Sequence, residues 1–167
     1  LTGGSFILAG VFKFPNANIV TNAATIVLDG PTSAIQNAAG VNALANFATN
    51  ASTGSFTIEN GRNLSTGAFT NAGQVGIGPG NSTWSVTGGY SQSGGQTRLA
   101  GGVLAATGPV NIAAGGLVGS GTIGGSLTNA GLVSPGASPG AIHVTGSYTQ
   151  SAGGVLRVEL GGTDAIV

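Results

Sequence analysis

The sequence predicts an all-β fold, a parallel β-helix (β-solenoid) with about three short strands in each coil of about 20 residues. Three features predict it: a long internal duplication, a shorter repeat within it, and small apolar groups separated by glycine, asparagine, serine or proline. Glycine makes up 33 of the 167 residues. Tight corners between strands often need a positive φ angle, which glycine and asparagine adopt most easily.

The duplication covers more than 25 residues and repeats tyrosine, glutamine and asparagine in the same order. The second copy lies 58 positions after the first. The matching segments are 67–73 with 125–131, 86–93 with 144–151 and, after one inserted residue, 97–99 with 156–158. A register held over this length indicates that the same structural unit occurs more than once.

A shorter repeat, Thr-Asn-Ala, starts at Thr21, Thr49, Thr70 and Thr128, with spacings of 28, 21 and 58 residues. The spacing of 21 fits one coil, and 58 is close to three units of 19 to 20. The spacing of 28 fits one coil plus an insertion, which we place at 42–48. This insertion is the only stretch with a weakly helical pattern.

Apolar and polar residues alternate in most of the short groups, as expected for half-buried strands. We expect strands at 25–28, 55–58, 74–77, 83–86, 110–112 and 142–144. About eight coils at the usual strand separation of about 4.8 Å would form a body roughly 38 Å long. A β-sandwich is the alternative, but hairpin spacing gives no reason for a long duplication at one offset.

Composition excludes several classes of protein. The chain has no cysteine, so a disulfide scaffold, a zinc finger and a thiol nucleophile are excluded. Four basic residues, balanced by four acidic ones, do not form the basic face of a nucleic-acid-binding protein. Disorder is disfavoured because the chain is 41% hydrophobic and carries no net charge. No apolar run is long enough for a spanning helix.

We expect residues 1–167 to form one β-solenoid domain that is a fragment or a processed piece of a longer repeat protein. The first residues carry no basic, apolar signal sequence. Neither 1–8 nor 155–167 has the charge or the helical pattern of a cap over the open end of a β-helix. Exposed strand edges promote further pairing. The expected partners are therefore a longer chain or a second copy stacked end to end.

The acidic residues do not predict an active site. Glycoside cleavage needs two carboxylates on either side of one bond. Asp29 and Glu59 both precede turn residues, so we expect them in separate turns. Glu159 follows Arg157 by two positions, which favours a solvated ion pair on one side of a strand. Asp164 could join Glu159 only if the chain folded back. No catalytic residue is assigned, and the chain is not expected to be an enzyme.

No cofactor or metal ion is expected either. His143 lies between Ile142 and Val144, which predicts an exposed side chain on a strand. Lys13 lies between two phenylalanines and is likewise expected to point outward. The nonapeptide of calcium-binding β-helices is absent, and the acidic residues are too few for an oxygen cage. The Gly-Gly segments lack the lysine and the helix of a phosphate loop.

Trp84, Tyr90 and Tyr148 are the candidate residues for contact with a ligand or an interface, because their rings can stack on sugars or anchor a partner. The duplication places Tyr90 and Tyr148 at the same position three coils apart, about 14 Å from each other. The interpretation we favour is that these rings pack at the corners of coils, with ligand contact as the other possibility. Exposed hydroxyl and amide side chains would suit a glycan, although they also occur on any soluble β-helix.

Several C-terminal segments closely resemble the repeats of autotransporter passengers and of related large secreted β-helical proteins of Gram-negative bacteria. The most specific is Pro-Gly-Ala-Ser-Pro-Gly at 135–140, followed by Gly-Ser-Tyr-Thr-Gln at 146–150. The other segments are 115–125, 128–131 and 154–160. The resemblance covers about residues 54–160, and residues 1–53 fit it more loosely. The resemblance implies a right-handed parallel β-helix exported to the cell surface or beyond, serving adhesion, cell contact or display. The resemblance does not extend to a membrane-anchoring barrel, so self-transport is not among the expectations for this piece.

The sequence therefore predicts a non-enzymatic structural β-solenoid, an adhesive stalk or filament-forming module outside a Gram-negative cell or on its outer surface. A glycan-binding adhesin module is the alternative function. A β-helix enzyme that cleaves polysaccharides is the less favoured alternative.

Overall fold

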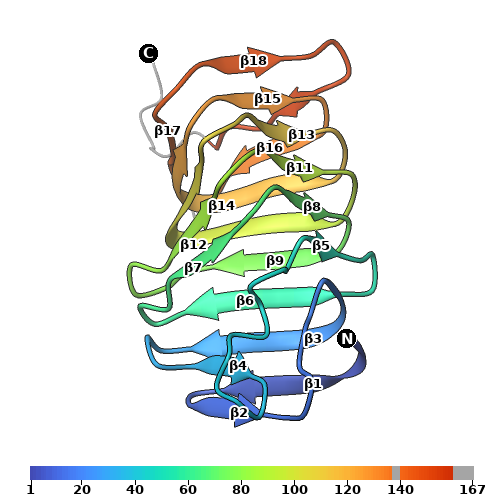
Figure 1. The fold of residues 1–167 in the computed structure, drawn as a ribbon. Helices are drawn as coiled ribbons and strands as arrows, with labels where there is room; N and C mark the ends of the chain where they lie inside the picture. Colours follow the sequence, from blue (N-terminus) through green and yellow to red (C-terminus); the bar gives the residue numbers. More distant parts are fainter. Residues whose placement is uncertain (137–139, 160–167) are drawn as a thin grey trace, which may run out of the picture.

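The computed structural model describes residues 1–136 and 140–159, and this part of the chain forms a parallel β-solenoid of about eight coils (Figure 1). Every pair of neighbouring strands is parallel. The described residues contain no helix. This confirms the predicted parallel β-helix and excludes the β-sandwich, whose sheets would be antiparallel. Asp164 and the middle of the Pro-Gly-Ala-Ser-Pro-Gly segment, 137–139, lie outside the described residues.

The strands are short and occur in the order shown in Figure 1. They are β1 (Thr2–Leu8), β2 (Val11–Lys13), β3 (Thr21–Asp29), β4 (Ala34–Gln36), β5 (Thr49–Asn50), β6 (Ser55–Glu59), β7 (Leu64–Thr66), β8 (Phe69–Asn71), β9 (Gln74–Ile77), β10 (Thr83–Val86), β11 (Tyr90–Gln92), β12 (Gln96–Ala106), β13 (Val110–Ile112), β14 (Gly116–Gly124), β15 (Leu127–Asn129), β16 (Leu132–Pro135), β17 (Ile142–Val144), β18 (Tyr148–Gln150) and β19 (Val155–Leu156). All six predicted strands are present.

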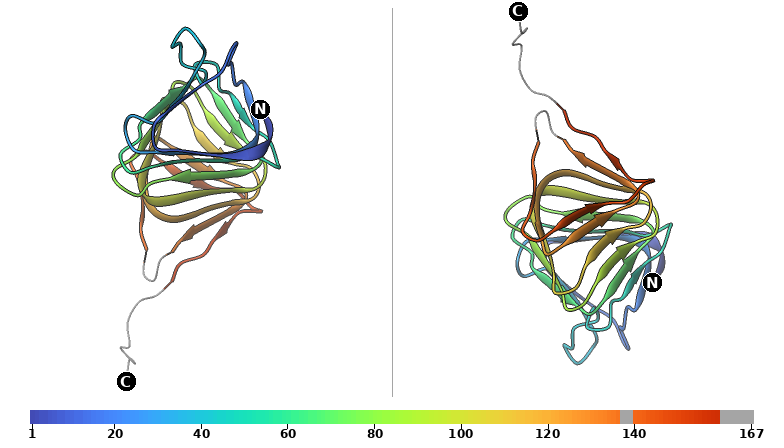
Figure 2. Two further views of the ribbon diagram at one scale, coloured as in Figure 1. Left: turned by 90° about the horizontal axis from the view of Figure 1, so that it is seen from below. Right: turned by 90° about the horizontal axis from the view of Figure 1, so that it is seen from above.

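Three ladders of strands run along the stack and enclose its interior (Figure 2). The first ladder is β1-β3-β6-β9-β12-β14-β16-β19, the second is β7-β10-β12-β14-β17, and the third is β3-β5-β8-β11-β13-β15-β18. The long strands β12 and β14 pass around a corner and belong to two ladders. Near the N-terminal end, β2 and β4 form a separate pair.

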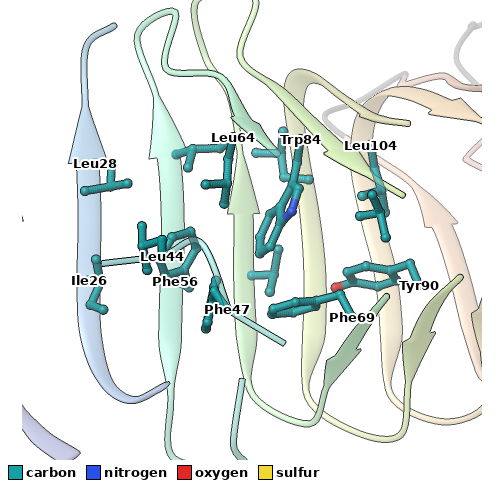
Figure 3. Packing of buried hydrophobic residues seen from close by; sticks show 14 of the residues in the cluster. Ile26, Leu28, Leu44, Phe47, Phe56, Leu64, Phe69, Trp84, Tyr90 and Leu104 are labelled. Atoms are coloured by element: carbon teal, nitrogen blue, oxygen red, sulfur yellow. The ribbon is translucent and has the colours of Figure 1, made fainter. Parts of the chain in front are cut away.

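Most of the interior is filled by columns of mainly apolar side chains, to which each coil contributes one residue (Figure 3). Along the first ladder, one column contains Phe6, Ile26, Phe56, Val75, Thr97, Leu117, Val133 and Leu156. Alternate residues of each strand face inward, which gives β3 and β6 their alternating burial. The apolar interior of the coils is the main source of stability for such a stack.

An inward column made of side-chain amides, with one isoleucine among them, runs along the third ladder. Its members, in coil order, are Asn22, Asn50, Asn71, Gln92, Ile112, Asn129 and Gln150. The amide nitrogen of Asn22 donates to Asn50 Oδ1, and that of Asn50 donates to Asn71 Oδ1, both over 2.9 Å. Asn71 and Asn129 thus lie in one column three coils apart, as the duplication predicts.

The outward neighbours of this column confirm the register of the shorter repeat. Thr21, Thr49 and Thr70 are aligned on successive coils. Two further coils separate Thr70 from Thr128, contributing Ser91 and Asn111 to the same outward column. The spacings of 28, 21 and 58 residues therefore correspond to one coil with an insertion, one coil and three coils, as predicted.

The duplication does not hold its register on the second ladder. Val144 stacks through Ile123 and Leu104 on Trp84, and not on Val86 as the offset of 58 implies. The reason is a shorter corner between the second and third ladders: Leu127 follows Ile123 by four residues, whereas Val110 follows Leu104 by six. The alignment is regained on the first ladder, where Leu156 lies in the column of Thr97 as predicted.

The insertion after β4 forms turns, and not the helix that its pattern weakly suggests. Its Leu44 and Phe47 side chains are fully buried in the interior. The Phe47 ring lies 4.6 Å from the Phe56 ring and 4.8 Å from the Phe69 ring, measured between centroids (Figure 3). The insertion therefore completes the core of the N-terminal coils.

Glycine is required at one stacked corner, which precedes β12 and β14. Gly95 and Gly115 have φ angles of +59° and +73°. A Cβ atom on Gly95 would lie 1.9 Å from the carbonyl oxygen of Gly73, and one on Gly115 would lie 2.2 Å from that of Gly95. Successive coils thus approach too closely at this corner for any side chain. Among the described residues, no helix is long and apolar enough to cross a membrane.

Candidate functional site

Trp84 lies on the inward face of β10 and has no exposed surface. Its ring packs against Phe56 and Phe69, at centroid distances of 5.3 and 4.7 Å (Figure 3). Its indole nitrogen donates to the Thr66 hydroxyl over 3.0 Å, so the one polar atom of the side chain is satisfied. A fully buried ring cannot stack on a ligand, so the prediction of a contact role is wrong for Trp84.

Tyr90 is also fully buried, on the inward face of β11. Its hydroxyl lies 2.6 Å from that of Thr97, which donates to Gln92 Oε1 over 2.6 Å. Burial raises the pKa of the Tyr90 hydroxyl well above its ordinary value, and side-chain hydrogen bonds with Thr97 and Asn71 offset this only in part. Tyr90 therefore belongs to the buried polar network, and the prediction of a ligand contact is wrong for it as well.

Tyr148 differs, because 39% of its surface is exposed on the last complete coil. It lies in the column of Tyr90, separated from it by Val110 and Leu127. This confirms that the two tyrosines occupy equivalent positions three coils apart. Its hydroxyl donates to Gln150 Oε1 and accepts from the Asn129 amide over 3.2 Å. Of the three predicted contact residues, only Tyr148 is accessible.

The structure brings together two carboxylates that the sequence analysis places in separate turns. Asp29 ends β3, Glu59 ends β6, and the two residues are register partners on neighbouring coils. The Asn60 amide donates to Asp29 Oδ1 over 2.7 Å. Sequence reasoning missed this pair because the insertion separates the two strands; aligning 25–29 with 55–59 across it would have revealed the pair.

The remaining charged residues are dispersed. His143 and Lys13 are exposed, as predicted. Arg157 and Glu159 are exposed as well, but they do not form the expected ion pair within the described residues. In the described part of the chain, no group of three or more acidic or histidine side chains could hold a metal ion.

A concave bay is present on the outer face of the first ladder. It has a volume of about 330 Å³ and lies over β6, β9 and the start of β12. Its lining residues are Thr57, Glu59, Gly76, Ile77, Gly78, Pro79, Arg98 and Ala100. Glu59 and Arg98 place opposite charges in this bay. No sequence motif indicates that the two residues lie close together.

The last described coil presents a second candidate surface, which is apolar. A cavity of about 250 Å³ lies there, lined by Leu127, Val133, Pro135, Ile142, Val144, Tyr148, Leu156 and Val158. Val155, Leu156 and Val158 are each about half exposed, at 52%, 48% and 59%. Leu156 and Tyr148 continue inward columns, so this surface is the open end of the hydrophobic interior.

No family model matches the chain. Neither a curated protein nor a solved structure matches it significantly. The fold therefore defines the class of protein, a β-solenoid, and the surfaces described above carry the functional argument.

Proposed function

We propose that this chain is a structural, non-enzymatic β-solenoid module, an adhesive stalk or filament-forming element outside a Gram-negative cell or on its outer surface. The observation that carries the proposal is the open apolar end at the last described coil. Half-exposed valines and leucine at a strand edge favour the addition of a further coil, because this buries apolar surface and pairs backbone groups. That coil comes from a longer polypeptide or from a second copy.

The two ends of the stack are complementary in register. Leu156 and Phe6 occupy the last and first described positions of one inward column. A second copy stacked end to end would place its Phe6 on Leu156 and continue this column. The chain's low charge supports the same arrangement, since four basic and four acidic residues give little repulsion between copies.

End-to-end stacking is tested by measuring the assembly of the purified chain. We expect concentration-dependent association in analytical ultracentrifugation and rods of varying length in negative-stain electron microscopy. Leu156→Lys should abolish the association, because it places a charge at the centre of the apolar end. Val41→Lys is the control, since Val41 is 57% exposed on the side of the stack. Association unaffected by Leu156→Lys would contradict the proposal.

The cellular location is proposed on the resemblance of the C-terminal segments to autotransporter passengers. Proteolysis of intact cells provides the test, because a surface-exposed module is accessible to added protease. The chain should be degraded without lysis, while a cytoplasmic marker remains intact. Protection of both proteins until lysis would contradict an external location.

The non-enzymatic part of the proposal is tested on Asp29 and Glu59, the one pair of carboxylates that the structure brings together within residues 1–136 and 140–159. Two carboxylates can support glycoside cleavage when they flank the scissile bond. We expect no reducing ends to be released from soluble polysaccharides. Turnover that is lost in both Asp29→Asn and Glu59→Gln would show instead that the chain is an enzyme.

A further inference from the structure

The bay on the outer face lies beside a strand position that lacks a side chain. Thr57, Gly76 and Arg98 are aligned outward positions on three neighbouring strands. Adjacent strands lie about 4.8 Å apart, so the backbones at Thr57 and Arg98 are about 9.6 Å apart with only Gly76 between them. The Gly78–Pro79 segment, which follows β9, forms one wall of the bay.

Backbone conformation does not explain the glycine at position 76. Gly76 is absent from the positions with positive φ, so other residues could adopt its backbone conformation. Glycine inside a strand is destabilising, and it often marks a place where another group approaches closely. A Cβ atom at this position would lie 2.8 Å from the Thr57 hydroxyl oxygen and 3.0 Å from its methyl carbon, so the Thr57 side chain already packs over this glycine. Gly76 therefore makes room for Thr57, and both residues line the bay.

The charged groups beside this space have no partner within the described chain. Neither the Glu59 carboxylate nor the Arg98 guanidinium forms an ion pair or a side-chain hydrogen bond with another described residue. Both line the bay, Glu59 from the end of β6 and Arg98 from β12. Asp29, the register partner of Glu59, adds a second carboxylate beside it. Hydrogen-bond donors and acceptors are thus both available in the bay.

These groups match the chemistry of a neutral saccharide. A carboxylate accepts two hydrogen bonds in a plane, and a guanidinium donates two in a plane, so each can engage a pair of adjacent hydroxyl groups. The Thr57 hydroxyl can donate or accept. A charged ligand would be attracted by one kind of side chain and repelled by the other, since Glu59 and Asp29 carry negative charge and Arg98 carries positive charge. Uncharged hydroxyl groups satisfy both kinds of side chain without this repulsion.

We propose that the bay around Gly76 binds a neutral saccharide through adjacent hydroxyl groups, with Glu59 as acceptor and Arg98 as donor. This site lies on the side of the solenoid and does not depend on end-to-end stacking. It also differs from the predicted aromatic contacts, two of which are buried. A stalk with such a site would attach to a glycan along its length.

Saturation-transfer NMR and calorimetry with cellotriose, maltotriose and triacetylchitotriose test the proposal on the intact chain. We expect at least one of these neutral probes to bind with a dissociation constant in the millimolar range or below. Glu59→Gln and Arg98→Gln should each weaken binding about tenfold or more, because each removes charged hydrogen bonds. Gly76→Val should abolish binding, because the valine side chain would displace that of Thr57 and occupy the bay.

Matched controls are available on the last coil, where Glu159→Gln and Arg157→Gln make the same chemical changes outside the bay. Both should bind like the unaltered chain. Circular dichroism and thermal unfolding identify any misfolded variant, and the two Gln variants at the bay keep the test valid if Gly76→Val misfolds. Failure of all three neutral probes to bind overturns the proposal. Binding that is insensitive to both Gln variants at the bay, or confined to charged probes such as trigalacturonate, also overturns it.

Discussion

Ile112 lies next to Asn129 in one inward column and leaves the buried Oδ1 atom of Asn129 without a hydrogen-bond donor among the described residues. On the other side of Ile112, the column continues with Gln92, whose amide donates to the carbonyl oxygen of Gly116 over 3.0 Å. The isoleucine therefore divides the amide column into two separate networks. Buried polar atoms without partners are rare and costly, so this position is a weak point of the interior.

Replacing Ile112 with asparagine should rejoin the two networks. Ile112→Asn loses apolar burial but supplies a hydrogen-bond donor to Asn129. The control is Ile77→Asn, which loses a similar amount of apolar burial. Its neighbours in the column are Ile58 and Leu99, so the new amide gains no polar partner. We expect Ile112→Asn to cost about 1–3 kcal/mol less in unfolding free energy than Ile77→Asn. Urea unfolding of the two variants measures the difference. Equal losses would show that the added amide does not join the column.

The continuous part of the column should be sensitive to the loss of a single amide. Asn50 accepts from Asn22 and donates to Asn71, as well as to the backbone at Gly54 and Gln74. Asn50→Ala should destabilise the chain by about 2–4 kcal/mol, because it leaves several buried groups unpaired.

The outward position of the third ladder supplies the control for that variant. Asn111 lies on β13 in the outward column, where its side chain makes no hydrogen bond to another described residue. Asn111→Ala should change the unfolding free energy by less than about 0.5 kcal/mol. Similar losses in the two variants, measured by urea unfolding, would contradict a special role for the buried column.

The buried tyrosine should make stability depend on alkaline pH. Burial raises the pKa of Tyr90 above its ordinary value of 10.0, so the folded chain keeps a proton that the unfolded chain releases. The unfolded state then binds fewer protons, and stability falls as pH rises above about 10. Unfolding measured from neutral to alkaline pH should show a smaller decline for Tyr90→Phe. The same decline in both proteins would exclude Tyr90 as the cause.

The insertion should contribute to stability through one aromatic side chain. Phe47 is fully buried against Phe56, Phe69 and Trp84 (Figure 3). Phe47→Ala should therefore cost about 3–5 kcal/mol, as for other large-to-small core substitutions. Thermal and urea unfolding measure the loss, with Val41→Ala, at an exposed residue just before the insertion, as the control. A small effect would show that neighbouring coils close the core without the insertion.

The sequence predicts the stacking well because repeats record which residues share a column. Thr21, Thr49, Thr70 and Thr128 fall in one column, and Leu156 falls in that of Thr97. Identical residues recur in such columns because each packs on its equivalent in the next coil. Coil length and the third ladder could therefore be predicted without coordinates.

The candidate sites were less predictable, since they depend on features that repeats do not encode. Burial of Trp84 and Tyr90 depends on which alternate face of a strand points inward, and an amphipathic ring fits either face when its polar atom finds a partner. The bay depends on Gly76 lying between Thr57 and Arg98, which are far apart in the sequence. Only the register between coils reveals that proximity.

Whole coils of this rod are interchangeable units of length. Removal of residues 70–90 would join Phe69 to Ser91, and the resulting Phe-Ser-Gln strand would match the Tyr-Ser-Gln strand already present at β11. Gln92 would then follow Asn50 in the amide column without a break. A gene encoding such a chain could lengthen or shorten its product by recombination between coils, while the cross-section of the rod stayed the same.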